Sequence, residues 1–257
     1  VAMTVICVPF AGGGAVSYVA LAKALQASGV PVRVHAVEPP GRTRDDSRPA
    51  LPTELLATEL AAEIAAAVAG PVVLLGHCAG AATALATARA LADAQVPVRH
   101  LIIVSMVLKS TDPEHHLADD VAQMTDAEVR DWLVEGSGLR GVDGISAREW
   151  RDIARAFRHD TLQASLTYAR LLRAGGPVAR GPATVVLATD DPVTSGHVPK
   201  ARDWQLLVPD VDVVTLDGGG HYINTTRTEE LAACIATAVG LATGSAAVHG
   251  RSAGGAS

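Results

Sequence analysis

Short apolar runs that alternate with stretches of helical pattern are the main periodic feature of the chain. Each run is rich in Val, Ile and Leu, as buried strands of a parallel sheet are. The predicted strands are residues 4–9, 32–37, 72–75, 101–107, 184–188 and 211–216. The predicted helices between and after them are residues 17–27, 53–68, 81–94 and 228–242, with Ser17 and Thr53 as N-caps of the first two. This alternation predicts βαβ units and therefore an α/β fold, with a mostly parallel central sheet flanked by helices.

The alternation stops after residue 108 and resumes near residue 178. Between them the pattern predicts helices and loops but no strand; the helices are residues 118–123, 126–133, 147–159 and 161–174. A helical insertion of this kind in an α/β chain commonly covers the active site as a lid. We therefore predict a core of residues 1–108 and 178–243 and a lid at 109–177. The Gly, Ser and Ala content of residues 244–257 predicts a disordered tail.

Composition narrows the class of protein without indicating a reaction. Apolar residues make up 49% of the 257 residues, which is enough for one sizeable core. The formal net charge is −6 and there is no Lys/Arg run, which argues against a nucleic-acid partner. Three distant cysteines (Cys7, Cys78 and Cys234) fit neither a disulfide framework nor a zinc site, and we expect no metal or cofactor. Reduced thiols, and apolar runs too short to span a bilayer, favour a cytoplasmic protein.

The sharpest motif is Gly76-His-Cys-Ala-Gly80, which lies between a predicted strand and a predicted helix. This is the G-x-nucleophile-x-G elbow of the α/β-hydrolase fold with cysteine as the nucleophile. The glycines leave room for a strained turn, and the N-terminus of the following helix favours a thiolate. We predict that Cys78 is the nucleophile and that His77 is structural. Cys7 and Cys234 are expected to be core residues.

A thiol nucleophile needs a base, and that base an orienting acid. Among nine histidines, His221 follows a strand and three glycines and precedes the last helix, which is where this fold presents its base. His197 is the main alternative. The other candidates lie in the insertion and are predicted to be surface or lid residues: His115, His116 and His159.

Asp191 follows the strand at 184–188 and precedes a proline, so we predict that it is the acid. Its neighbour Asp190 remains an alternative, because spacing alone cannot separate adjacent residues. Asp112 is a third candidate, since some proteins of this fold carry the acid after an earlier strand, although that strand here ends in Ser105. The order of the predicted nucleophile, acid and base along the chain is the order typical of the fold.

Two backbone N–H groups should stabilise the oxyanion. One is predicted to be that of Ala79, which follows the nucleophile. The other should come from the loop Pro9-Phe-Ala-Gly-Gly-Gly after the first strand, where glycine lets the backbone approach a ligand, and Ala11 is the predicted donor. A phosphate loop is disfavoured because no Lys-Ser/Thr follows the glycines.

Together these stretches resemble the type II thioesterases of polyketide and nonribosomal peptide assembly lines, from about residue 5 to residue 242. The stretches are Pro9-Phe-Ala-Gly-Gly, Pro40-Gly-Arg, Gly76-His-Cys-Ala-Gly, Ile103-Val-Ser, Asp191-Pro and Gly219-Gly-His. The resemblance implies a helical lid, an acyl substrate carried on the phosphopantetheine of an acyl or peptidyl carrier protein, and a monomer. The family elbow usually carries serine. The chain is therefore a natural cysteine enzyme, an engineered Ser-to-Cys variant, or an enzyme whose hydrolysis has been replaced by transfer or cyclisation.

Cysteine changes the expected chemistry. Moving an acyl group from a pantetheine thiol to Cys78 exchanges one thioester for another and is close to thermoneutral. An acyl-serine ester lies lower, so returning its acyl group to a thiol is uphill. We predict acyl processing through an acyl-Cys78 intermediate, ending in hydrolysis, transfer or cyclisation, with His221 as the base for an attacking water.

Two other functions remain open from the sequence. One is a small-molecule ester or lactone hydrolase resembling dienelactone hydrolase, against which the long insertion and the Pro40-Gly-Arg loop argue. The other is a non-catalytic binding protein, against which the Cys–Asp–His set argues. Arg42 and Arg44 could contact the acidic surface of a carrier protein or the phosphate of its arm, or could be solvated loop charges.

Overall fold

The computed structural model describes residues 3–42, 46–108 and 118–240. Its centre is a six-stranded sheet in the order β2-β1-β3-β4-β5-β6, and every neighbouring pair is parallel. The strands are β1 (Met3–Val8), β2 (Val32–Ala36), β3 (Val72–His77), β4 (Val98–Val104), β5 (Ala183–Ala188) and β6 (Val211–Leu216). The six predicted strands and the parallel sheet are thus confirmed, with ends shifted by up to a few residues.

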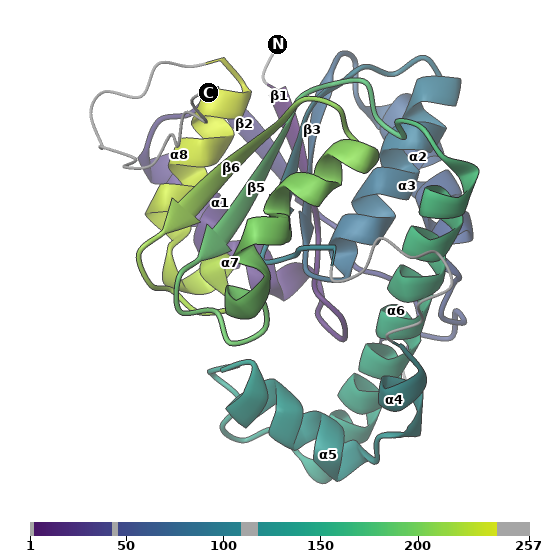
Figure 1. Ribbon diagram of the computed structural model, residues 1–257, viewed down its shortest axis with the longest axis vertical. Helices are drawn as coiled ribbons and strands as arrows, with labels where there is room; N and C mark the ends of the chain where they lie inside the picture. Colours follow the sequence, from purple (N-terminus) through teal and green to yellow (C-terminus); the bar gives the residue numbers. More distant parts are fainter. Residues whose placement is uncertain (1–2, 43–45, 109–117, 241–257) are drawn as a thin grey trace.

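Helices cover both faces of this sheet (Figure 1). They are α1 (Val19–Ala27) and α8 (Thr228–Ala238) on one face, and α2 (Thr53–Ala67) and α3 (Gly80–Asp93) on the other. Alternate residues of a strand point to opposite faces. Leu74 accordingly packs in the cluster beneath α2 and α3, whereas Leu75 packs in the cluster beneath α1 and α8. Because β3 is central in the sheet and buried on both faces, it holds Cys78, the residue that follows it, in a fixed position.

The predicted N-caps are wrong in both helices. Ser17 lies inside a 3₁₀ helix, η1 (Ala15–Tyr18), so α1 begins only at Val19. Pro52 occupies the N-cap of α2, and the N–H of Thr53 donates to the side chain of Gln163 at 3.3 Å. After β5 two further elements were not predicted: η3 (Ser195–Leu206), a run of 3₁₀ turns, and the short α7 (Ile223–Thr226).

The segment between β4 and β5, called here the insertion (residues 118–174), extends beyond the carboxyl ends of the strands (Figure 1). It contains α4 (Ala118–Gln123), α5 (Asp126–Asp131), the π-helical turn η2 (Trp132–Gly136) and α6 (Ala147–Ala174). The predicted break between helices 147–159 and 161–174 is wrong, since α6 is continuous. No Gly or Pro interrupts it, and Asp160 at the predicted break bonds to core residues rather than ending the helix. The predicted tail, and residues 109–117 of the predicted lid, lie outside the described residues.

Candidate active site

Cys78 lies on the tight turn between β3 and α3. Its φ angle is 51°, a left-handed conformation that costs a non-glycine residue about 1–3 kcal/mol. Its N–H donates to the carbonyl of Val104 at 2.9 Å, which ties the turn to the next strand. A Cβ on Gly76 would lie 2.5 Å from Cα of Ala81, and one on Gly80 would lie 2.4 Å from the carbonyl oxygen of Pro9. Both glycines of the motif are therefore required by close backbone approach.

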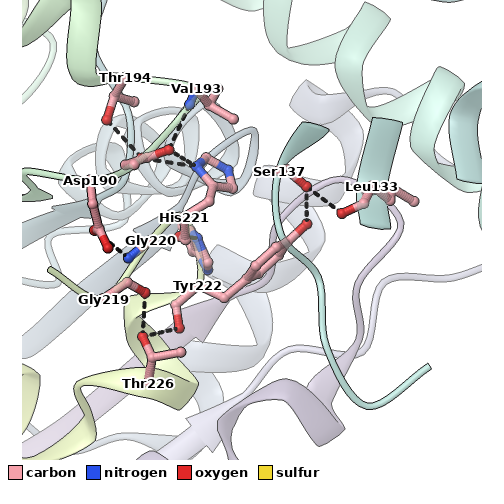
Figure 2. A network of polar contacts seen from close by, with 12 residues as sticks. Leu133, Ser137, Asp190, Val193, Thr194, Gly219, Gly220, His221, Tyr222 and Thr226 are labelled. Carbon is pink, nitrogen blue, oxygen red and sulfur yellow. Dashed lines mark hydrogen bonds and ion pairs between the residues drawn. The ribbon is translucent and has the colours of Figure 1, made fainter. Parts of the chain in front are cut away.

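His221 and Asp191 form a buried pair at the ends of β6 and β5. Nδ1 of His221 lies 3.1 Å and 3.0 Å from the two carboxylate oxygens of Asp191. The carboxylate also accepts hydrogen bonds from the N–H of Val193 at 2.8 Å and the hydroxyl of Thr194 at 2.7 Å (Figure 2). A carboxylate can only accept, so Nδ1 of His221 carries a hydrogen and Nε2 is left for a second partner.

The electrostatics of this pair favour its charged form. Burial opposes charge on His221, but attraction to Cys78 and hydrogen bonds with Asp191 and Cys78 raise its pKa to about 10. Burial also opposes charge on Asp191, yet hydrogen bonds from His221, Thr194 and Val193 lower the pKa of that carboxyl group. The structure therefore brings the side chains of Cys78, His221 and Asp191 together, with His221 between the other two.

The alternatives to the predicted acid and base lie elsewhere. The loop between β6 and α7 that carries His221 is called here the histidine loop (residues 217–222). Asp190 points to the backbone of this loop and accepts the N–H of Gly220 at 2.7 Å (Figure 2). His197 is part of η3 and makes no side-chain hydrogen bond to the nucleophile or the acid among the described residues. His159 lies on α6 beside Asp160. The remaining candidates fall outside the described residues: Asp112, His115, His116 and Arg44.

The other two cysteines are core residues, as predicted. Cys7 is fully buried in β1, and burial raises the pKa of its thiol to about 12. Cys234 is buried in α8, and burial raises the pKa of its thiol to about 11. Because a thiol reacts as its thiolate, neither group is suited to nucleophilic attack at neutral pH.

The loop after β1 forms a tight turn beside the Cys78 turn. The N–H of Gly13 donates to the carbonyl of Phe10 at 2.9 Å, and Gly12 has a φ of 77°, a combination typical of a type II turn. Ala11 and Ala79 pack in the same small apolar cluster. In the described part of the chain, neither of these two alanines donates a backbone hydrogen bond from its N–H. Both N–H groups are thus available to a ligand.

His77 has a more specific position than the sequence predicted. It is fully buried, and its Nε2 donates to the carbonyl of His221 at 2.9 Å. Burial, and then repulsion by His221, lower the pKa of His77 to about 3, so the ring is neutral at physiological pH. The rings of Phe10 and Tyr222 contact it edge-on, with centroids 5.2 Å and 5.8 Å away. His77 therefore connects the turn that carries Cys78 to the backbone of the histidine loop at His221.

A hydrogen-bonded chain joins the insertion to the histidine loop. The hydroxyl of Ser137 donates to the carbonyl of Leu133 at 2.8 Å, so its oxygen accepts from the hydroxyl of Tyr222, also at 2.8 Å (Figure 2). Tyr222 follows His221 directly. The sequence did not predict this contact, because it joins residues far apart in the chain.

A cleft of about 320 Å³ lies between the insertion and the core. Its lining residues are Phe10, Val16, Ser17, Gly138, Leu139, Arg140, Gly141, Tyr222, Thr225 and Thr226. Arg140 is the one charged residue among them, and it forms no ion pair with another described residue. The volume is within the range of small-molecule sites, and the lining is mixed apolar and hydroxyl.

Arg42 is neither a free phosphate-binding group nor a solvated loop charge. Its guanidinium lies 2.6 Å from the carboxylate of Asp160, and its side chain is 12% exposed. The arginine thus ties the Pro40-Gly-Arg loop to α6. Among the described residues there is no group of three or more His, Cys, Asp or Glu side chains that could hold a metal ion. No helix in the described ranges is long and apolar enough to cross a membrane.

A family model for the thioesterase domain matches residues 3–239. The chain belongs to the thioesterase domain family. Solved thioesterases share its fold. RedJ from the prodiginine pathway of Streptomyces coelicolor is 23% identical, with a TM-score of 0.73 over 92% of this chain and 90% of that one. The type II thioesterase BorB from the borrelidin cluster is 25% identical, with a TM-score of 0.71 over 93% of each chain.

These likenesses confirm the predicted α/β-hydrolase fold and the resemblance to type II thioesterases. Among curated proteins, phenyloxazoline synthase MbtB of Mycobacterium tuberculosis (strain ATCC 25618 / H37Rv) is 41% identical over 98 residues. That match covers 38% of this thioesterase-family chain and 7% of the synthase. The chain therefore corresponds to a small part of the curated relative.

Proposed function

We propose that this member of the thioesterase family processes acyl groups held as thioesters on the phosphopantetheine arm of acyl or peptidyl carrier proteins. The observation that supports this most directly is the Cys78 turn beside the buried His221–Asp191 pair. The relatives support the substrate class, since BorB is named as a type II thioesterase of a biosynthetic cluster and RedJ as a thioesterase of a biosynthetic pathway.

In the proposed first step, the Cys78 thiolate attacks the thioester carbonyl. The developing oxyanion accepts hydrogen bonds from the N–H groups of Ala11 and Ala79, which have no partner in the described structure. The intermediate collapses, the carbon–sulfur bond to pantetheine breaks, and His221 gives its Nε2 proton to the leaving thiolate. The products are acyl-Cys78, a neutral imidazole and free pantetheine thiol.

In the second step, neutral His221 removes a proton from the acceptor, which attacks the acyl-Cys78 carbonyl and expels the thiolate. The raised pKa of His221 supports an imidazolium in the resting site, which can donate its Nε2 proton in the first step. Because the acyl enzyme is itself a thioester, we propose that a second thiol or a nucleophile within the substrate competes well with water. Asp191 holds the imidazolium throughout and does not transfer a proton.

The test is an intact-mass time course with acyl-pantetheine thioesters, with and without a second thiol. We expect an adduct at Cys78 that is discharged by the added thiol, and no adduct on the Cys78→Ala variant. Free acid formed rapidly without an adduct would instead indicate hydrolysis. Turnover of simple esters or lactones without a pantetheine moiety would favour a small-molecule hydrolase. Absence of both adduct and product would contradict the proposal.

A further inference from the structure

Three segments distant in the sequence meet at the carboxylate of Asp160, near the middle of α6. One oxygen, Oδ2, accepts the N–H of Gly12 at 2.9 Å and the guanidinium of Arg42 at 2.6 Å. The other oxygen lies 3.3 Å from Nδ1 of His159. The side chains of Asp160 and Arg42 are only 16% and 12% exposed, so each charge depends on the other to offset the cost of burial.

The contact with Gly12 bears on the turn that follows β1. Two N–H groups of that turn are occupied, that of Gly13 by the carbonyl of Phe10 and that of Gly12 by Asp160. The turn is also packed against α6, because a Cβ on Gly12 would lie 3.2 Å from the carbonyl oxygen of Ile153. Ala11 precedes these two residues, and its N–H is left unbonded. That N–H shares a peptide plane with the Phe10 carbonyl, so the turn as a whole sets its direction, and Asp160 holds the turn at the next peptide.

We propose that Asp160 is a positioning residue for the oxyanion hole. From α6 its carboxylate holds the N–H of Gly12 and so stabilises the turn that directs the Ala11 N–H. Arg42 neutralises the carboxylate, which would otherwise place an unpaired negative charge beside a developing oxyanion. The oxyanion hole is then complete only while the middle of α6 rests on the β1 turn. This inference deepens the proposed function and depends on it for its kinetic consequence.

The test compares two reactions of the same thiol. Acylation of Cys78 by a thioester passes through an oxyanion, whereas its alkylation by iodoacetamide does not. For Asp160→Ala we expect the acylation rate to fall by about 10- to 100-fold, since deleting a whole donor costs about 10²- to 10³-fold. The alkylation rate should change by less than about twofold. Asp160→Asn keeps an acceptor for Gly12 and should retain more acylation than the alanine variant.

A matched control removes a different contact of the same helix. Glu54 on α2 pairs with Arg170 of α6 and accepts from Thr167, but touches neither the β1 turn nor the nucleophile. Glu54→Ala should leave the ratio of acylation to alkylation unchanged. If it lowers that ratio as much as Asp160→Ala does, or if Asp160→Ala slows both reactions equally, Asp160 supports only the fold and the proposal is overturned.

Amide hydrogen exchange supplies a readout that does not need turnover. In Asp160→Ala and Asp160→Asn, the peptide that contains Gly12 should exchange faster than in the wild type, with the larger increase in the alanine variant. Unchanged exchange at this turn in both variants would overturn the positioning role. Failure of the wild type to become acylated would instead count against the proposed function, and the exchange result would still decide the role of Asp160.

Discussion

The two sides of Cys78 are built in different ways. On the core side, Cys78, Asp191 and His221 follow β3, β5 and β6, so the backbone of a buried parallel sheet sets their spacing. On the insertion side, single side chains make the connections, namely Asp160 to the β1 turn and Ser137 to the histidine loop. Substitutions on the core side should therefore cause large losses of activity, whereas removing a single hydrogen bond on the insertion side should lower activity only in part.

The largest effect on the core side is expected at Asp191. Asp191→Asn cannot hold the Nδ1–H tautomer of His221 in the same way, and we expect the rate of acyl transfer to fall about 10³- to 10⁴-fold. The neighbour provides the control, because among the described residues the Asp190 side chain bonds only to the loop backbone at Gly220. Asp190→Asn should lower the rate of acyl transfer by less than about tenfold. Stopped-flow measurement of pantetheine thiol release compares the two, and equal losses would contradict the assignment of the acid.

This pair of aspartates also shows what could not be predicted from the sequence alone. The apolar pattern predicted all six strands, and the elbow motif predicted that Cys78 lies on a tight turn between a strand and a helix, because both depend on local rules. Asp190 and Asp191 are equivalent by spacing, and only the turn after β5 separates them. Asp160 was missed for a similar reason. The sequence predicted a helix break at position 160, whereas α6 continues through it and places the Asp160 carboxylate against Gly12 and Arg42, which are distant in the chain.

His77 tests the core side through the pH dependence of stability. Its folded pKa of about 3 lies below the usual value near 6.5, so between these values the unfolded state binds a proton that the folded state does not. Stability attributable to His77 is therefore complete above pH 6.5 and is lost as the pH falls toward 3. Between pH 7 and pH 5 the loss is about 2 kcal/mol.

His77→Gln, whose amide can still donate to the His221 carbonyl, should abolish that part of the acid sensitivity. Denaturant unfolding at the two pH values measures it. His100→Gln is the matched control. The His100 ring is also partly buried, and burial lowers its pKa, but it bonds to Thr184 away from the site, so this variant should leave the His77 contribution unchanged. If wild type and His77→Gln lose the same stability in acid, His77 is not the neutral buried donor described above.

On the insertion side, the hydrogen bond between Tyr222 and Ser137 should contribute a graded effect. Removing either hydroxyl removes a hydrogen bond that contributes about 1 kcal/mol. Tyr222→Phe and Ser137→Ala should therefore each slow acylation by about three- to tenfold. The double variant should be no slower than either single one, since both remove the same bond. Tyr168→Phe is the control, because the hydroxyl of that buried tyrosine has no partner among the described residues. Additive losses would show that the two hydroxyls act separately.

The smallest effect is expected at Arg140, which supplies the single charge in the cleft between insertion and core. If the phosphopantetheine arm lies there, the guanidinium pairs with its phosphate in a solvent-exposed setting, which is worth about 1 kcal/mol. Arg140→Ala should then raise KM about fivefold for an acyl-phosphopantetheine thioester and leave KM for the acyl-pantetheine thioester, which lacks the phosphate, unchanged. Arg148→Ala, at an exposed arginine on α6 outside the cleft, should alter neither value. Equal changes for both substrates would mean that Arg140 shapes the cleft without binding the phosphate, and the carrier arm would then have to approach Cys78 from another side.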